Sequence, residues 1–277
     1  MPLRLGTSSW SAESWVGPFY PEGTAPADFI AHYAKHFDTV EVDATFYRIP
    51  TPAMIENWKR KTPEGFTFSL KAPQVITHEK RLVGAQKELD EFLTVVKGLG
   101  NKLGPVLFQF PYFNKTQMPT PFPFFEALRK FVRELPEGFR FAVEVRNKTF
   151  LVPALLETLK SRRIALALID HPFMLKASEY RKRMDLLTTD WTYVRWLGDR
   201  VGIEKMTTSW DRVVVDRAAE TDSWVSTIRD LAPKYEIYGY FNNHYAGHAP
   251  ASIALFKKAW AAAGGGPIGP AGSAAGA

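Results

Sequence analysis

Hydrophobic and polar residues follow two different periods along this chain. Short segments rich in β-branched and aromatic residues are bounded by turn residues, which predicts strands. These segments are 3–9, 39–45, 67–72, 106–110, 140–145, 164–170, 193–197 and 236–241. Between them, apolar residues recur with helical spacing, as in Leu89, Phe92, Leu93 and Val96. The chain is therefore expected to alternate strand and helix.

Such alternation favours parallel strands joined by right-handed helical crossovers. The sheet could close into a barrel or stay open and doubly wound. The first strand leads into Gly6-Thr7-Ser8-Ser9-Trp10, which lacks the glycine spacing of a dinucleotide-binding loop. Eight units also suit a barrel. We therefore expect an α/β fold with a single (β/α)8 TIM-like barrel over 1–260, followed by a disordered Gly/Ala/Pro-rich tail over 261–277.

Barrel enzymes build their sites at the carboxyl ends of the strands, where alternate side chains point into the lumen. Charged and amide side chains gather at those ends in this sequence. They are Glu41, Asp43, Lys71, Gln109, Glu144, Arg146, Asp170, Arg195, Asn242, Asn243 and His244. Burying so many charges is costly unless they pair with one another or serve a function.

Two explanations of this charged ring stay open. In the first, Glu41, Glu144 and Asp170 are catalytic carboxylates, with Glu41 and Glu144 as the acid/base pair. The ligand-binding candidates are then Lys71, Gln109, Arg146, Arg195, Asn242, Asn243, Tyr47 and Trp10. The three cations among them suit a phosphate or carboxylate. In the second, pairs such as Glu41–Lys71 and Glu144–Arg146 only tie the barrel mouth together.

The sequence predicts no cofactor. Glu144, Asp170 and His244 could hold a divalent metal, a weaker alternative because no HxH or HExxH spacing occurs. The chain has no Cys, which excludes thiolate nucleophiles, zinc–thiolate sites and disulfides.

The net charge is +6 and the pI is near 9.3. This balance indicates either a solvated basic surface or attraction to anionic partners, but no long run of Lys and Arg marks a nucleic-acid tail. No apolar segment is long enough to span a bilayer, and no signal peptide is recognised. We expect a cytoplasmic protein whose partner is a small anionic or sugar-like ligand, with nucleic acid as the alternative partner. The oligomeric state is not predicted.

Eight motifs occur in one order: GTSSW, GPFYP, EVDATFYRIP, KAPQVITH, LFQFP, EVRN, YVRW and YFNNHYAGHA. Together they resemble the YecE-like family, the domain of unknown function seventy-two, from about Leu5 to Trp260. The resemblance implies a TIM barrel and a bacterial or archaeal cytoplasmic protein, and it implies no reaction. The family's recurring polar positions correspond to Glu41, Thr45, Tyr47, Lys71, Gln109, Glu144, Arg146, Arg195, Asn242 and Asn243. Asp43 and Leu197 depart from the family pattern, which usually has Asn at the first position and often His at the second.

Three functions stay open at this point. The favoured one is an enzyme, a hydrolase or an isomerase/lyase, that uses carboxylate acid/base chemistry on a small anionic or polyhydroxylated compound. The second is a hydrolase acting on nucleic acid or glycosides. The third is a non-catalytic binding or scaffold barrel, because one fold hosts many functions.

Overall fold

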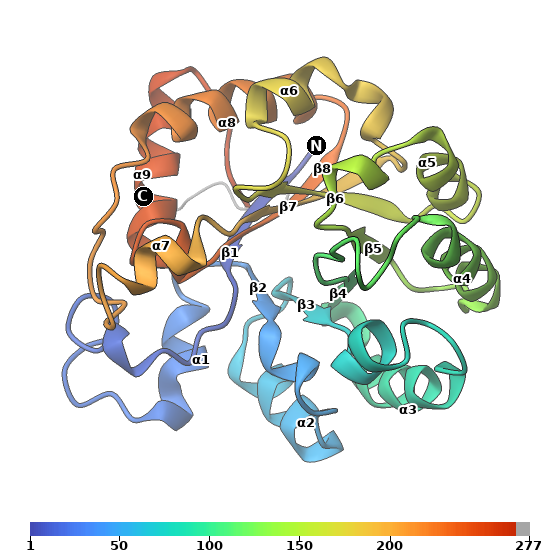
Figure 1. Cartoon of the computed structure of the whole chain (residues 1–277). Coiled ribbons are helices and arrows are strands. Elements are labelled where there is room, and N and C mark those ends of the chain that lie inside the picture. Colours follow the sequence, from blue (N-terminus) through green and yellow to red (C-terminus); the bar gives the residue numbers. More distant parts are fainter. Residues whose placement is uncertain (270–277) are drawn as a thin grey trace.

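The computed structural model describes residues 1–269 of the 277-residue chain. Eight parallel strands follow the order β1-β8-β7-β6-β5-β4-β3-β2, and Figure 1 shows them at the centre of the molecule. A single bridge between Ser8 and Glu41 links β1 to β2 and completes the ring. The strands are β1 Leu3–Thr7, β2 Thr39–Val42, β3 Thr67–Lys71, β4 Leu103–Gln109, β5 Phe141–Glu144, β6 Ala165–Asp170, β7 Trp191–Trp196 and β8 Glu236–Phe241. The predicted TIM-like barrel is confirmed.

A tyrosine hydroxyl fills the seam between β1 and β2. The Tyr33 hydroxyl accepts from the Thr7 N–H at 2.8 Å and donates to the Thr39 carbonyl at 3.0 Å. The hydroxyl thereby bonds to buried backbone groups that hydrogen bonds between adjacent strands would otherwise satisfy. The strands approach so closely here that a Cβ on Gly6 would lie 2.1 Å from the Thr39 oxygen. The seam therefore requires glycine at this position.

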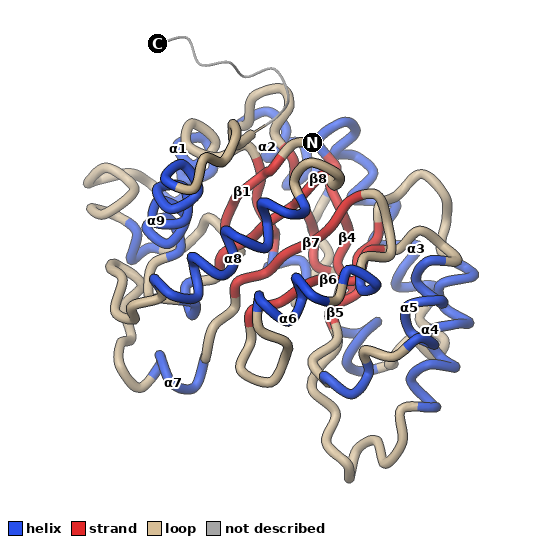
Figure 2. The backbone as a smooth tube through the Cα atoms, turned by 90° about the horizontal axis from the view of Figure 1, so that it is seen from above, coloured by secondary structure: helices blue, strands red, loops and turns tan. Residues whose placement is uncertain are grey.

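Helices cover the outside of the barrel, as Figures 1 and 2 show. Thr51 caps the helix that begins at Pro52, since the Thr51 hydroxyl accepts from the Met54 N–H at 3.2 Å. No helix within residues 1–269 is long and apolar enough to cross a membrane. The helices are α1 Phe29–Tyr33, α2 Pro52–Lys61, α3 Gln86–Val96, α4 Phe122–Glu134, α5 Pro153–Lys160, α6 Ala177–Lys182, α7 Arg200–Glu204, α8 Ala218–Leu231 and α9 Ala249–Ala262.

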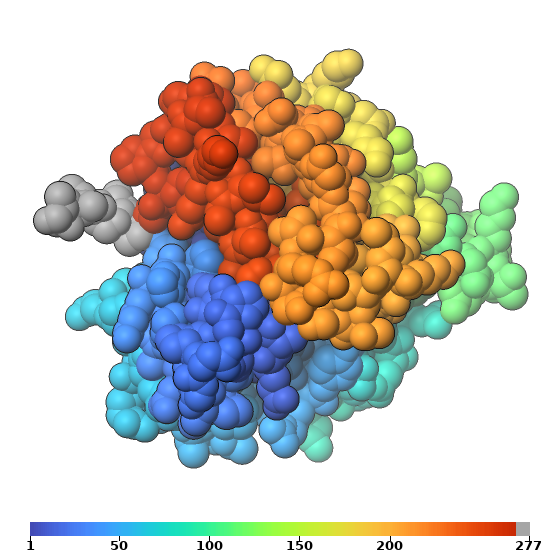
Figure 3. Space-filling model, turned by 90° about the vertical axis from the view of Figure 1, so that its left-hand side faces the viewer, coloured from blue at the N-terminus to red at the C-terminus, as the bar shows by residue number. Residues whose placement is uncertain are grey.

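The two ends of the described chain meet on one side of the barrel. Figure 3 shows the blue N-terminal segment beside the red α9. The α9 helix continues past Trp260, whose indole N–H donates to the Gly266 carbonyl at 2.7 Å. The Gly269 N–H donates to the Leu3 carbonyl at 2.8 Å. Residues 261–269 thus differ from the disordered tail that we expected, because these contacts hold them against the barrel. Residues 270–277 lie outside the described part.

The second strand is shorter than its sequence pattern predicts. It ends at Val42, and a 3-10 turn, Asp43–Phe46, follows instead of a strand to Thr45. The Thr45 hydroxyl lies 2.7 Å from both the Val42 and the Lys71 carbonyl oxygens. This hydroxyl therefore anchors the turn at the carboxyl ends of β2 and β3, where it carries Asp43 over the barrel mouth.

Candidate functional site

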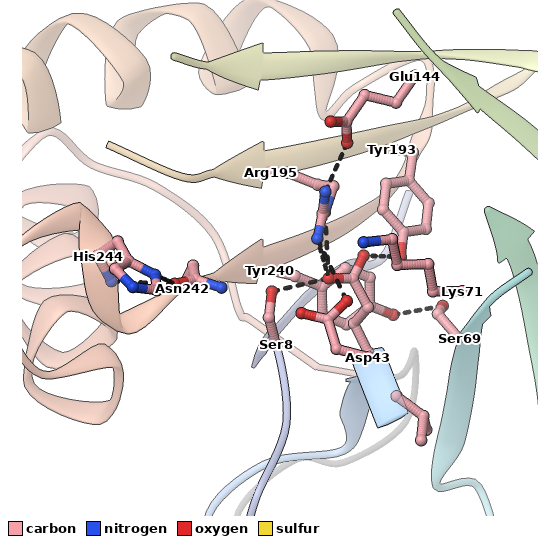
Figure 4. A network of polar contacts seen from close by, with 12 residues as sticks. Ser8, Asp43, Ser69, Lys71, Glu144, Tyr193, Arg195, Tyr240, Asn242 and His244 are labelled. Carbon is pink, nitrogen blue, oxygen red and sulfur yellow. Dashed lines mark hydrogen bonds and ion pairs between the residues drawn. The ribbon is translucent and has the colours of Figure 1, made fainter. Parts of the chain in front are cut away.

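Arg195 lies at the centre of the barrel mouth and is only 2% exposed. Its Nη2 donates to Glu41 Oε1 at 2.7 Å, and its Nη1 donates to Glu144 Oε2 at 2.6 Å. Figure 4 shows the guanidinium joined to the Glu144 carboxylate of β5, and Glu41 reaches the same guanidinium from β2. Both glutamates are fully buried. A buried charge needs such pairing, because its solvation by water is lost.

Glu41 has more hydrogen-bond partners than the sequence indicated. The Ser8 hydroxyl donates to its Oε1 at 2.7 Å and the Tyr193 hydroxyl donates to its Oε2 at 2.5 Å. Burial raises the pKa of this carboxyl, and Arg195 opposes the rise. The expected pair between Glu41 and Lys71 is replaced by the pair with Arg195, because the guanidinium reaches both carboxylates at once.

Glu144 is held by two arginines. Its Oε1 accepts from Arg146 Nε at 3.0 Å, which is the pair expected from the sequence. Burial alone would raise the pKa of Glu144, but Arg195 and Arg146 outweigh it and bring the pKa to about 2. Two carboxylates on one guanidinium therefore have opposite pKa shifts, and Glu144 is the one that stays ionised at every ordinary pH.

Three charged side chains lie above this buried triad, and solvent reaches them. Asp43 is 27% exposed and contacts Arg195 at 3.5 Å, while Arg146 is 28% exposed. The Lys71 Nζ lies 3.9 Å above the centre of the Phe46 ring. Burial lowers the pKa of the Lys71 amine, and the charge of Asp43 opposes this most strongly. These groups form the accessible surface of the candidate site.

Two histidines near the mouth were given no role by the sequence. Burial and the charge of Lys71 lower the pKa of His78 to about 4. Burial and the charge of Arg146 lower the pKa of His171 to about 4. Both imidazoles are therefore neutral at pH 7. They follow β3 and β6, and no spacing in the sequence marks them.

Asp170 does not join the cluster. Its Oδ2 accepts from the Trp224 indole N–H at 2.6 Å, on the side facing α8. Strand pairing sets Asp170 opposite Trp196, whose ring packs against Trp224, so both point away from the lumen. Within residues 1–269 no three His, Cys, Asp or Glu side chains could hold a metal ion. Glu144, Asp170 and His244 therefore do not form the metal site considered above.

The two asparagines after β8 support the local backbone. Asn242 Oδ1 accepts from the His244 N–H at 3.0 Å, and Figure 4 shows this pair to one side of the cluster. Asn243 Oδ1 accepts from the Trp15 indole at 3.2 Å and from the Ala249 N–H at 3.0 Å. These bonds hold the loop before α9.

The remaining candidates lie around the mouth. Gln109 is buried and its amide donates to the Phe110 carbonyl. Trp10 packs edge-on against Trp58 at 5.5 Å between ring centres. Tyr47 is 75% exposed. Of the residues predicted from sequence, the structure therefore gathers Glu41, Asp43, Lys71, Glu144, Arg146 and Arg195.

Comparison with known proteins agrees with this architecture. A family model described as "Protein of unknown function DUF72" matches residues 4–274. The UPF0759 protein YecE of Escherichia coli (strain K12) is 31% identical over 149 residues, which cover 53% of this chain and 50% of that protein. The UPF0759 protein YunF of Bacillus subtilis (strain 168) is 30% identical over 167 residues, covering 56% and 54%. The chain thus spans about half the length of the curated relatives it matches.

A solved structure extends the likeness to the whole fold. The DUF72 family protein of Thermotoga maritima aligns with a TM-score of 0.72 and 26% identity, over 93% of this chain and 98% of that one. A DUF72 family protein of Enterococcus faecalis aligns with a TM-score of 0.69 and 20% identity, over 94% and 95%. The motifs, the barrel and the family model agree, and the chain belongs to the family described as protein of unknown function DUF72.

Proposed function

We propose that the barrel mouth is an active site that binds a small anionic or polyhydroxylated compound and acts on it by acid/base chemistry. One observation carries this proposal. The buried triad of Glu41, Arg195 and Glu144 leaves further charged groups in contact with solvent directly above it. A cluster that served only to hold the barrel together would be expected to engage its charged groups fully, whereas Arg146 uses only its Nε among the described residues.

Arg146 is the group best suited to bind an anion. Only its Nε is engaged by the described residues, in the bond to Glu144, so both Nη atoms are available. A guanidinium edge with two free nitrogens matches the two oxygens of a carboxylate or phosphate. Its position at the end of β5 holds this edge at the barrel mouth.

The buried glutamates are better suited to positioning than to contact with a ligand. Each is fully buried, and their oxygens are already engaged by Arg195 and neighbouring donors. We therefore assign to them the orientation of Arg195 and Arg146, in place of the acid/base roles expected from the sequence. Asp43, which is partly exposed at the same mouth, takes the role of general base.

A thermal-shift screen of sugar phosphates, nucleotides and organic acids tests this function. A ligand that binds only the folded state raises the melting temperature in proportion to the logarithm of its concentration over its Kd. We expect a stabilising compound whose effect is lost in Arg146→Ala. Arg163→Ala is the matched control, because Arg163 precedes β6 at the opposite end of the barrel. Equal loss in both variants, or a shift unchanged by Arg146→Ala, contradicts the proposal.

Exposed aromatic rings favour a second candidate function, the binding of a sugar or nucleobase ring. Tyr112 follows β4 and Phe173 follows β6, and their ring centres lie 5.9 Å apart. Both are exposed, and they follow the strands on either side of β5, the strand that Arg146 follows. Exposed aromatic faces stack on rings of either kind. Loss of binding in Tyr112→Ala would support this reading, and a steep salt dependence would identify a nucleic acid.

A further inference from the structure

Lys71 has an amine that the protein itself does not use. Within residues 1–269 its Nζ has no hydrogen-bond acceptor and no carboxylate within 4 Å, and it lies 3.9 Å above the centre of the Phe46 ring. The backbone beneath it is rigid, because β3 pairs Lys71 with Leu107 and the Thr45 hydroxyl donates to the Lys71 carbonyl. The backbone from which the amine extends is therefore fixed, and the amine itself has no hydrogen-bond partner among residues 1–269.

Two other lysines of intermediate exposure are used differently. The Lys102 Nζ donates to the Lys59 and Thr62 carbonyls at 2.7 and 2.6 Å, so this ammonium is a structural donor. Lys80 pairs with Glu88 at 2.7 Å. A lysine amine that is partly buried and has no carboxylate partner shifts towards the neutral amine, which is the nucleophilic form. Burial lowers the pKa of Lys71 in this direction.

We propose that Lys71 is a catalytic nucleophile that forms an imine with the carbonyl carbon of an aldehyde or ketone bearing a phosphate or carboxylate group. This inference rests on the proposed function and names its substrate class. The anionic group would lie against the free edge of Arg146, and the carbonyl would lie over Lys71. Both side chains come from strand ends of the same mouth.

The step balances with groups that are present. The neutral amine attacks the carbonyl carbon and forms the C–N bond, leaving a positive nitrogen and a negative oxygen. The Asp43 carboxylate takes one proton from that nitrogen and returns it to the oxygen, which gives the carbinolamine. A second proton, from solvent, leaves with the hydroxyl as water when the C–O bond breaks and the protonated imine forms. Asp43 suits this transfer because it is the charge that acts most strongly on Lys71.

Several other charged groups face the amine. Arg195 favours the neutral amine, whereas Glu144 and Glu41 favour the ammonium. His78 is close enough for the charge of Lys71 to lower the pKa of its imidazole. Because Arg195 already engages both glutamates, their opposing effect on Lys71 is partly cancelled. Burial therefore keeps the pKa of the Lys71 amine below its ordinary value, although carboxylates surround it.

Reductive trapping tests the inference without knowledge of the natural substrate. The whole protein is treated at pH 7 with limiting glycolaldehyde and sodium cyanoborohydride, which reduces imines, and the labelled lysines are mapped by peptide mass spectrometry. Lys257 is the matched internal control, since it also lies over a ring, Phe37 at 5.5 Å, and burial also lowers its pKa. Lys87, 82% exposed, reports an ordinary lysine.

We expect Lys71 to be labelled faster than Lys87, by about tenfold for each unit by which the pKa of Lys71 lies below the ordinary lysine value. We also expect it to be labelled faster than Lys257, because Asp43 and Arg146 lie near Lys71 and not near Lys257. Labelling of Lys71 no faster than of Lys257 and Lys87 overturns the inference. Lys71→Arg keeps the positive charge and should melt close to wild type while losing the labelled peptide. A labelling pattern unchanged in Lys71→Arg also overturns it.

A second arm separates this inference from the function on which it rests. Glycolaldehyde phosphate replaces glycolaldehyde, and wild type is compared with Arg146→Ala. Faster labelling of Lys71 by the phosphorylated aldehyde, lost in Arg146→Ala, supports both proposals. If Lys71 is labelled but glycolaldehyde phosphate labels it no faster than glycolaldehyde, the imine proposal is supported and the proposed anion site is contradicted. An Arg146-dependent thermal shift without labelling of Lys71 keeps the proposed function and refutes the imine.

Discussion

Replacing Arg195 with Met removes the guanidinium that neutralises two fully buried carboxylates. Removing one partner of a buried ion pair costs about 3–5 kcal/mol, because the charge left behind is neither solvated nor paired. The low pKa of Glu144 gives an independent figure. A fall from its ordinary 4.5 to about 2 corresponds to roughly 3 kcal/mol of stability at neutral pH, supplied mainly by Arg195. We therefore expect Arg195→Met to lose about 3–5 kcal/mol at pH 7.

The loss should depend on pH with a definite sign. In the wild type, the depressed pKa of Glu144 contributes stability above pH 4.5 that disappears as the pH falls towards about 2. In the variant, burial without Arg195 raises the pKa of both carboxyls, so the folded protein binds protons that the unfolded chain releases. Acid then favours the folded variant. The difference between wild type and variant should shrink as the pH falls from 7 towards 4.5.

Urea unfolding followed by tryptophan fluorescence measures both quantities. The control variant carries Glu41→Gln and Glu144→Gln together with Arg195→Met, which removes all three charges at once. Neutral replacement of a buried ionic group restores much of the stability that single removal costs. A deficit below about 1 kcal/mol at pH 7, or one that does not change with pH, would refute the reasoning that these charges depend on one another.

Three smaller predictions address other contacts. Tyr33→Phe removes the hydroxyl that bonds to backbone groups of β1 and β2, so it should lower the free energy of unfolding in urea by about 2 kcal/mol. The control Tyr47→Phe alters an exposed side chain and should change this free energy by less than about 0.5 kcal/mol. Asp170→Asn keeps an oxygen that accepts from the Trp224 indole outside the lumen. The stabilising compound should therefore bind this variant with an apparent affinity within about twofold of wild type in the thermal-shift assay, and complete loss of its binding would show that Asp170 belongs to the site. Phe46→Leu removes a ring face that stabilises the Lys71 ammonium by about 0.5–1 kcal/mol. More of the amine is then neutral, so reductive labelling of Lys71 by glycolaldehyde at pH 7 should be roughly two- to fivefold faster. Slower labelling would contradict the contact.

The periodic patterns of the chain were sufficient for the architecture. Strand segments are short and β-branched, helices carry apolar stripes, and parallel crossovers leave few topologies, so the barrel follows from local rules. Alternation along β2 and β5 also predicted which charges face the lumen, and Glu41 and Glu144 do lie there. The same reasoning was less accurate at the strand ends, because hydrogen bonds such as those of Thr45 end β2 early.

Which charged residues at the barrel mouth pair with one another depended on tertiary structure. Nothing in the local sequence says that Tyr193 and Ser8 donate to Glu41, or that one guanidinium spans two carboxylates, since these residues meet only when distant strands close the barrel. Asp170 is the last residue of β6 as Glu144 is of β5, yet the register with β7 turns it outward to an indole. The sequence by itself determined the barrel and most of its inward charges, because periodicity is a local property. Which charges are neutralised and which stay free was decided by packing across the lumen, because pairing depends on distances between strands far apart in the chain.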